Sequence, residues 1–501
     1  MHHAVLSGFE DVAELLLRRG ADVNAPSKTA GLPICLAALK DRSNMVRLLL
    51  SKFRASVKLA DPELGTPLHC AAFLGNCEVA RCLLGYGADI DSTDRVDSSK
   101  LLAHQRYPSI NAPVDQESML DTCWTQVTPL IIAITARRLA FVRLLLQSGC
   151  QVDRPSEYGD NELLLRRPLR VAAWLGLTDI VGLLTSSGAG LDLGGVGGAN
   201  ALSVASHRWQ ADCVKNSIEA GTSVHISNER GNTALIAASA NGHVDCVRQL
   251  LNAGASVDLY DEDGSTALIS ASTHGNYVCV DYLLGAGASL DKTEKEYGST
   301  ALHEAVIQGH ARCAQILCEN GADVNARRLD GSTALYGAAS HAMLESVRMM
   351  LKYQADPSLP HEKGWTPLMA AIEAAKPQSA AIVEALLNAG ALVTVRSDCG
   401  LTALHIAMRL GQKQIARMLV DAEAATSVQC RACHDHVGKP CGCMELDRTL
   451  RAPPQVRKTD TGGKTPTREV KQIDMGKHLK RDAEKGQVAW GGWSRRPRKI
   501  G

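Results

Sequence analysis

The chain has 501 residues, 45% of them hydrophobic, so it is long enough for about three ordinary domains and too apolar to be disordered throughout. Only 4% of the residues are aromatic, which favours a core of many thin aliphatic layers over one large enzyme cavity. The overall charge of +1 hides a split, because residues 427–501 hold 17 basic and 8 acidic residues (+9) and the remaining body is mildly acidic (−8), as is typical of an appended interaction tail.

No segment approaches the roughly 18 consecutive apolar residues that a membrane-spanning helix needs. Residues 1–10 contain no basic segment followed by an apolar run, so we expect no secretory signal. Most of the 16 cysteines lie inside apolar helical patterns, where thiols act as small hydrophobic groups. These features predict an intracellular, cytoplasmic protein with reduced thiols.

A short motif, Thr followed by Pro or Ala and then Leu, recurs along the chain up to residue 425. From residue 200 onward its intervals are 33, 33, 34, 33, 33 and 36 residues, which is typical of a stacked repeat protein. Counting a first unit that lacks the motif, the sequence predicts twelve units. The first residues of the motif, called anchors below, are Leu32, Thr66, Thr128, Arg167, Asn200, Thr233, Thr266, Thr300, Thr333, Thr366 and Thr402 in units 2 to 12, with Leu32, Arg167 and Asn200 as weaker equivalents.

Unit 9 shows the elements that we expect each unit to form. The hydroxyl of Thr300 can cap the first helix, whose apolar residues recur at a spacing of three to four. Gly309 can end that helix in a left-handed conformation, and a second helix follows around residues 313–317. The polar residues 325–331 then form a turn. One helix pair is too thin to bury its apolar face, so neighbouring units must stack.

This pattern resembles the ankyrin repeat, a family of helix–turn–helix units that project hairpin turns called fingers. The resemblance covers residues 1–425 and implies an all-α solenoid. It also implies a protein-interaction scaffold or adaptor that binds protein partners on a concave surface of finger tips and inner helices. We expect no enzyme activity, because the body contains no recognised catalytic triad, dinucleotide or metalloprotease motif.

Several units depart from the family pattern between and within their helices. Asp41, Arg137, Trp209 and Ala342 stand where the glycine that separates the two helices is expected. The histidine three residues after the anchor is kept only at His69, His303 and His405. We therefore expect the hydrogen-bond ladder of these histidines to be broken in the middle of the array.

Three insertions interrupt the period. The largest, about residues 96–126, belongs to a finger, and an insertion of this size is usually either functional or disordered. A second, around residues 155–166, lengthens the next finger. A third, near residues 375–379, is expected to lengthen a turn between helices.

Four cysteines occupy one register of consecutive units, at intervals of 33, 33 and 34 residues. Stacking would place them in a ladder, which could hold a metal or serve redox chemistry, or could fill a buried slot. Apolar neighbours favour the buried slot. These cysteines are Cys213, Cys246, Cys279 and Cys313.

Residues 426–446 form a candidate small Cys/His module. Its ligand-type residues are Cys430, Cys433, His434, His436, Cys441 and Cys443. The segment resembles the first half of a RING-type zinc finger, and the second half is absent from this sequence. One tetrahedral Zn²⁺ is feasible with the four cysteines, or with His434 or His436 in place of one thiol. The alternative to a zinc site is a flexible Cys-rich tail. A zinc site would favour an alternative function for the protein, as a substrate-recognition component in ubiquitin transfer with a degenerate zinc module at 430–443.

The remaining tail, residues 447–501, is basic and poor in apolar anchors, which predicts disorder. The run from Arg495 to Lys499 could act as a nuclear-import signal, so a nuclear location stays open. Few aromatic residues accompany these charges, and we do not expect the tail to bind nucleic acid specifically.

Successive fingers carry clusters of charge. We predict that an acidic patch here binds a basic segment of a partner, although solvated turns also favour such residues. The predicted partner-binding residues are Asp261, Glu262, Asp263, Glu294, Glu296, Arg327 and Arg328.

Overall fold

The computed structural model describes residues 1–27, 31–103, 123–155, 157–158, 167–195 and 197–422. Every helix described below lies within residues 1–422. The predicted module at 426–446, with its six candidate zinc ligands, and the predicted disordered tail at 447–501 lie outside the described residues. So does most of the insertion at 96–126.

Twelve helix pairs follow one another through the described residues, as the repeat predicts. They are α1 (His2–Ser7) and α2 (Glu10–Arg18), α3 (Pro33–Leu39) and α4 (Ser43–Ser51), α5 (Pro67–Leu74) and α6 (Cys77–Gly85), α9 (Pro129–Thr135) and α10 (Leu139–Gln147), α11 (Pro168–Trp174) and α12 (Thr178–Ser186), α13 (Ala201–His207) and α14 (Ala211–Glu219), α15 (Ala234–Ala240) and α16 (Val244–Asn252), α17 (Ala267–Thr273) and α18 (Tyr277–Gly285), α19 (Ala301–Ile307) and α20 (Ala311–Glu319), α21 (Ala334–Ser340) and α22 (Leu344–Lys352), α23 (Pro367–Glu373) and α24 (Ser379–Asn388), and α25 (Ala403–Arg409) and α26 (Lys413–Asp421).

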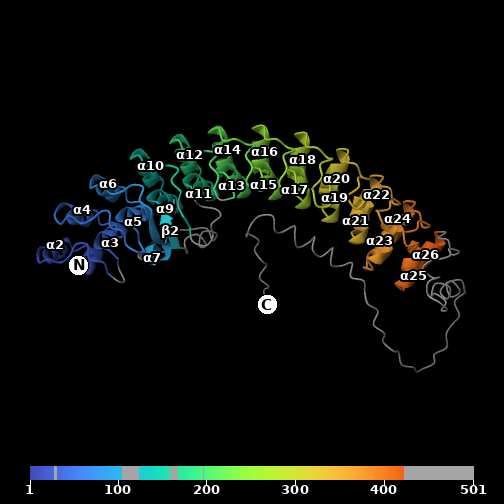
Figure 1. Cartoon of the computed structure of the whole chain (residues 1–501), viewed down its shortest axis with the longest axis horizontal. Coiled ribbons are helices and arrows are strands. Elements are labelled where there is room, and N and C mark those ends of the chain that lie inside the picture. Colours follow the sequence, from blue (N-terminus) through green and yellow to red (C-terminus); the bar gives the residue numbers. More distant parts are fainter. Residues whose placement is uncertain (28–30, 104–122, 156, 159–166, 196, 423–501) are drawn as a thin grey trace, which may run out of the picture. The chain divides into compact units, whose positions relative to one another are not determined.

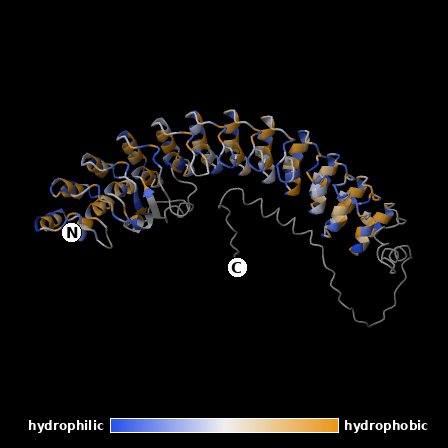
Figure 2. Cartoon of the chain, in the orientation of Figure 1, coloured by the Kyte–Doolittle hydropathy of each residue, from blue (hydrophilic) through white to orange (hydrophobic). Residues whose placement is uncertain are grey.

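Neighbouring pairs stack like on like. Each first helix packs against the first helices of adjacent units, as α15 does with α13 and α17, and each second helix does the same, as α16 does with α14 and α18 (Figure 1). Hydrophobic residues are concentrated in the helices, whereas the turns between them are largely hydrophilic (Figure 2). The core repeats from unit to unit, with Leu235 and Val247 of unit 7 matched by Leu268 and Val280 of unit 8, all at most 1% exposed.

Most anchors cap the first helices through their side chains, whereas Leu32 and Arg167 do not. Six of them, the five threonines Thr128, Thr233, Thr266, Thr333 and Thr366 together with Asn200, accept the backbone N–H three residues on without help from a histidine. In units 3, 9 and 12 the histidine three residues after the anchor completes a reciprocal capping box. The Nε2 of His69 also donates to the carbonyl of Val127 in the next finger, at 2.8 Å. The histidine ladder is therefore interrupted in the middle, as predicted.

The largest insertion adds strands to the helical array. Strand β1 (Asp94–Asp97) pairs antiparallel with β2 (Cys123–Val127), which pairs with β3 (Glu157–Tyr158) of the next finger. Helix α7 (Ser98–Ala103) follows β1. Both insertions thus extend neighbouring fingers, as expected, but into a three-stranded sheet that the all-α prediction did not contain.

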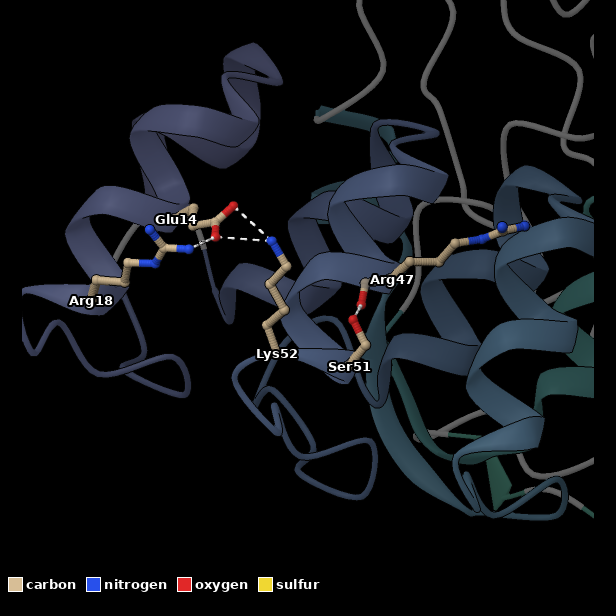
Figure 3. A network of polar contacts seen from close by, with 5 residues as sticks. All are labelled: Glu14, Arg18, Arg47, Ser51 and Lys52. Atoms are coloured by element: carbon tan, nitrogen blue, oxygen red, sulfur yellow. Dashed lines mark hydrogen bonds and ion pairs between the residues drawn. The ribbon is translucent and has the colours of Figure 1, made fainter.

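A polar network joins the first two units. The Nζ of Lys52 lies 2.9 Å from a carboxylate oxygen of Glu14, which also pairs with Arg18 (Figure 3). The hydrogen bond from Lys52 is the main reason that the pKa of Glu14 is lowered. Ser51 donates to the carbonyl of Arg47 on the same helix, at 2.7 Å.

In the part of the chain that the structure describes, no helix is both long enough and apolar enough to cross a membrane.

Candidate functional site

Five of the fingers turn around a side chain five residues before the anchor. In the finger of unit 8, Oδ1 of Asp261 accepts the N–H groups of Asp263 (3.1 Å) and Ser265 (2.8 Å). A side chain at the same position closes the fingers of units 3, 7, 11 and 12 by accepting a backbone N–H group. These residues are Asp61, Asn228, His361 and Ser397.

This geometry corrects two predicted partner-binding residues. Asp261 is only 8% exposed, and burial raises the pKa of its carboxyl group. Glu294 is half-buried, and its carboxylate accepts the N–H groups of Glu296, Tyr297 and Ser299 at 2.6–2.9 Å. Both carboxylates therefore hold their own turns by accepting backbone N–H groups, and they are less exposed than the neighbouring Glu262 and Glu296.

A backbone ladder connects the finger tips from unit 6 to unit 12. In each finger one tip residue donates its N–H to a carbonyl of the preceding finger, at 2.8–3.1 Å. We call these six residues the tip ridge, and all six are exposed. They are Glu229, Glu262, Lys295, Leu329, Glu362 and Asp398.

The tip ridge is acidic over a longer distance than the sequence indicated. Four of its six side chains are carboxylates, and the predicted residues Asp263 and Glu296 are exposed beside it. Two cations are tethered to it: Nε of Arg230 lies 3.7 Å from Glu262, and Nζ of Lys295 donates to the Glu262 carbonyl at 2.9 Å. Contacts of this kind at the surface contribute little to stability. The four carboxylate side chains of the ridge remain exposed.

The two predicted arginines have different positions. Arg328 is half-buried, donates through Nε to Oγ of Ser299 (2.8 Å) and lies with its guanidinium 4.9 Å from the ring of Tyr297. Arg327 is exposed and donates to the carbonyl of Pro360 at 3.1 Å. Both arginines connect adjacent fingers, and of the two only Arg327 is exposed.

Leu329 is the ridge residue that the sequence analysis missed. Its side chain is 66% exposed, and it occupies the place that carboxylates hold in the fingers of units 7, 8, 11 and 12. A Cβ atom on Gly298 would lie 2.9 Å from Cγ of Leu329, so the glycine makes room for it. Its position is the sequence signal that could have identified Leu329. It lies at the same distance before the anchor as the acidic residues do in other units.

The four cysteines of the predicted ladder are all buried, at most 1% exposed. Burial raises the pKa of Cys246 to about 12 and those of Cys279 and Cys313 to about 11, which keeps them as unreactive thiols. This supports the buried-slot interpretation. Within the described ranges, no group of three or more His, Cys, Asp or Glu side chains is placed to hold a metal ion.

Comparison with known proteins gives matches to ankyrin repeats along most of the described chain. Residues 1–94, 202–295, 287–361 and 335–431 match the family described as ankyrin repeats in three copies. The channel protein "Transient receptor potential cation channel subfamily A member 1" of Drosophila melanogaster is 29% identical over 20% of this chain. Rabankyrin-5 of Mus musculus is 27% identical over 32% of this chain. The chain spans only 9% and 14% of these two relatives.

A shorter relative is covered more fully. "Putative ankyrin repeat protein FPV223" of Fowlpox virus is 32% identical over 22% of this chain and 77% of its own length. Among solved structures, the human ASB11 ankyrin repeat domain is 27% identical, covers 44% of this chain and 96% of its own, and gives a TM-score of 0.40. The ankyrin repeat domain of Bcl-3 is 29% identical, covers 44% and 97%, and also gives 0.40.

Proposed function

Because the chain belongs to the ankyrin-repeat family, we propose that it is a non-catalytic interaction scaffold whose tip ridge binds a basic segment of a partner protein. The observation that carries this proposal is the row of exposed carboxylates at Glu229, Glu262, Glu362 and Asp398, held in line by the backbone ladder. A row of like charges on a rigid support steers and orients an oppositely charged segment.

The ridge also favours a particular composition in that segment. Leu329 interrupts the carboxylates with an exposed apolar side chain, and Tyr260, 58% exposed, lies under Lys295 with the ammonium 5.5 Å from its ring. Apolar groups surrounded by charge are typical of interface centres, where they add affinity that charge alone does not supply. The partner segment should therefore combine Lys or Arg with at least one apolar side chain.

The test uses the full chain and a fluorescently labelled synthetic peptide of alternating lysine and leucine as the probe. The variant Glu262→Lys/Glu362→Lys reverses two ridge charges, leaves the turn-closing Asp261 intact and is expected to weaken binding at least tenfold. The control, Asp179→Lys/Asp245→Lys, reverses two exposed charges at the starts of α12 and α16 and should bind like the wild type. Equal affinity of the ridge variant and the wild type would refute the proposal.

Two further proposals rest on the sequence. We propose an intracellular location, with which the eleven free cysteines among the described residues agree. We also propose that Cys430, Cys433, Cys441 and Cys443, or His434 or His436 in place of one of them, hold one Zn²⁺, the arrangement that would favour the ubiquitin-transfer alternative. Measuring zinc per chain in the wild type and in Cys430→Ser/Cys433→Ser tests the metal site.

A further inference from the structure

The turns between paired helices share one backbone feature. The residue nine positions after each anchor, and Gly8 in unit 1, has a positive φ in all twelve described units, and it is glycine in seven of them. Trp209 occupies this position in unit 6 with φ of +61°. A bulky side chain in the left-handed region is a genuine outlier, and such strained residues concentrate at functional sites.

The Trp209 side chain is largely open to solvent. It is 67% exposed, although the imidazole of His243 from the next unit stacks on it with ring centroids 5.9 Å apart and planes inclined by 7°. His243 is held in place by its Nε2, which lies 3.0 Å from the carbonyl of His207. One face of the indole is thus supported from within the protein while most of the ring faces solvent.

The residue before Trp209 in the chain is a cation, Arg208, whose charge acts on His243. The guanidinium of Arg208 sits 4.3 Å from the ring centroid of Trp174 in the preceding unit. Its Nε is buried and has no hydrogen-bond acceptor among the residues that the structure describes, and none of their ion pairs includes Arg208. Burial lowers the pKa of His207 to about 4 and also lowers that of His243, so at neutral pH the charge here is that of Arg208.

We propose that Trp174, Arg208, Trp209 and His243 form a second docking site, which binds an acidic segment of a partner protein. A carboxylate of that segment pairs with the guanidinium of Arg208, and a neighbouring aromatic or proline ring packs on the open part of Trp209. Trp and Arg are the residue types that most often dominate interface energy, and a guanidinium forms strong, charge-assisted hydrogen bonds with a carboxylate. The tip ridge carries the opposite charge, so this site takes a different partner and does not depend on the proposed function.

The test selects peptides from a phage-displayed library of random peptides on the immobilised full chain. The expected result is enrichment of sequences with Asp or Glu beside an aromatic residue or proline. Synthetic copies should lose at least tenfold in affinity for Trp209→Gly and for Arg208→Gln. Trp209→Gly installs the residue that seven other units use here, so the fold is retained, which thermal melting verifies.

Two controls make the outcome specific to this site. The ridge variant Glu262→Lys/Glu362→Lys should bind the acidic peptides unchanged, and Tyr260→Ala, which removes another exposed aromatic ring, should do the same. The proposal is overturned if no acidic sequences are enriched, or if the enriched peptides bind Trp209→Gly as tightly as the wild type.

Discussion

The side chain of Asn276 lies directly across Gly242 of the preceding unit. A Cβ atom on Gly242 would sit 2.7 Å from the Asn276 amide oxygen, and the amide nitrogen donates to the carbonyls of Ser239 (2.8 Å) and Ala240 (2.9 Å). The residue ten positions after the anchor plays this part in several other units, reaching the last carbonyls of the preceding first helix, which lack partners within that helix. These residues are Arg138, His243, His310 and Gln412.

The positive φ of the turn, together with this contact at Gly242, disfavours a side chain there, and the two predict different effects of substitution at one structural position. Gly242→Ala should destabilise the protein by about 2 kcal/mol, because it adds both left-handed strain and a clash with Asn276. Trp209→Gly should change stability by less than about 1 kcal/mol, because relief of strain is offset by loss of the His243 stack. Urea denaturation of both variants measures this, and an equal loss in both would contradict it.

The fold was predictable from the sequence because its signals are local. The anchor hydroxyl, the helical spacing of apolar residues and the left-handed turn that glycine favours each act within one unit, and together they give twelve helix pairs. Asn200 even caps α13 as the threonines do, accepting the N–H of Ser203 at 2.9 Å. Strands β1 to β3 were not predictable, because strand pairing here depends on a neighbouring finger rather than on the residues of one segment.

The candidate site was predicted only in part, for a similar reason. Asp261 and Glu262 are adjacent acidic residues, yet one is buried in the turn and the other is exposed. Hydrogen bonds to backbone N–H groups decide which carboxylate turns inward, and composition does not reveal them. The distance from the anchor does reveal the inward carboxylate. In units 3, 7, 8, 11 and 12 the residue five positions before the anchor closes the turn.

A close approach at Gly195 gives a second prediction. Arg170, only 1% exposed, replaces the motif histidine of unit 5, and a Cβ atom on Gly195 would lie 1.1 Å from its Nη1. Gly195→Ala should therefore cost about 1–3 kcal/mol through overpacking. The matched control is Gly182→Ala in helix α12, where the nearest atom would be 3.7 Å away and alanine should be neutral or stabilising.

A double variant separates overpacking from other effects of the added methyl group. Shortening the opposing side chain in Arg170→Ile/Gly195→Ala should recover part of the loss, because isoleucine occupies the same motif position in units 4, 7 and 8. Thermal melts of the three variants provide the comparison. No recovery in the double variant would show that Arg170 is not the obstacle.

The buried side chain of His303 predicts that the stability of the fold depends on pH. The Nδ1 of His303 lies 3.3 Å from the backbone N of Thr300, and burial lowers its pKa to about 4, against about 6.5 when unfolded. The unfolded chain therefore binds a proton that the folded chain rejects, so stability falls as pH drops from about 6.5 toward 4, by up to about 3 kcal/mol. Hydrogen exchange of the α19 amides at pH 7 and pH 5, corrected for intrinsic rates, should show this loss.

His303→Ile serves as the control for that measurement, because Ile236 and Ile269 hold the same position in units 7 and 8. An isoleucine cannot titrate, so protection of α19 in this variant should depend less on pH than in the wild type. Identical pH dependence in both proteins would mean that His303 does not carry the effect.

The cysteine ladder gives the last prediction. Cys213, Cys246, Cys279 and Cys313 are buried, and burial raises their pKa values, so the thiolate that reacts with iodoacetamide is scarce and shielded. Cys399 is exposed beside Oγ of Ser397 at 3.1 Å. Brief native labelling followed by peptide mass spectrometry should modify Cys399 at least tenfold faster than the four ladder residues, and urea should abolish the difference. Rapid native labelling of Cys246 would instead indicate an accessible thiol ladder and reopen the metal or redox interpretation.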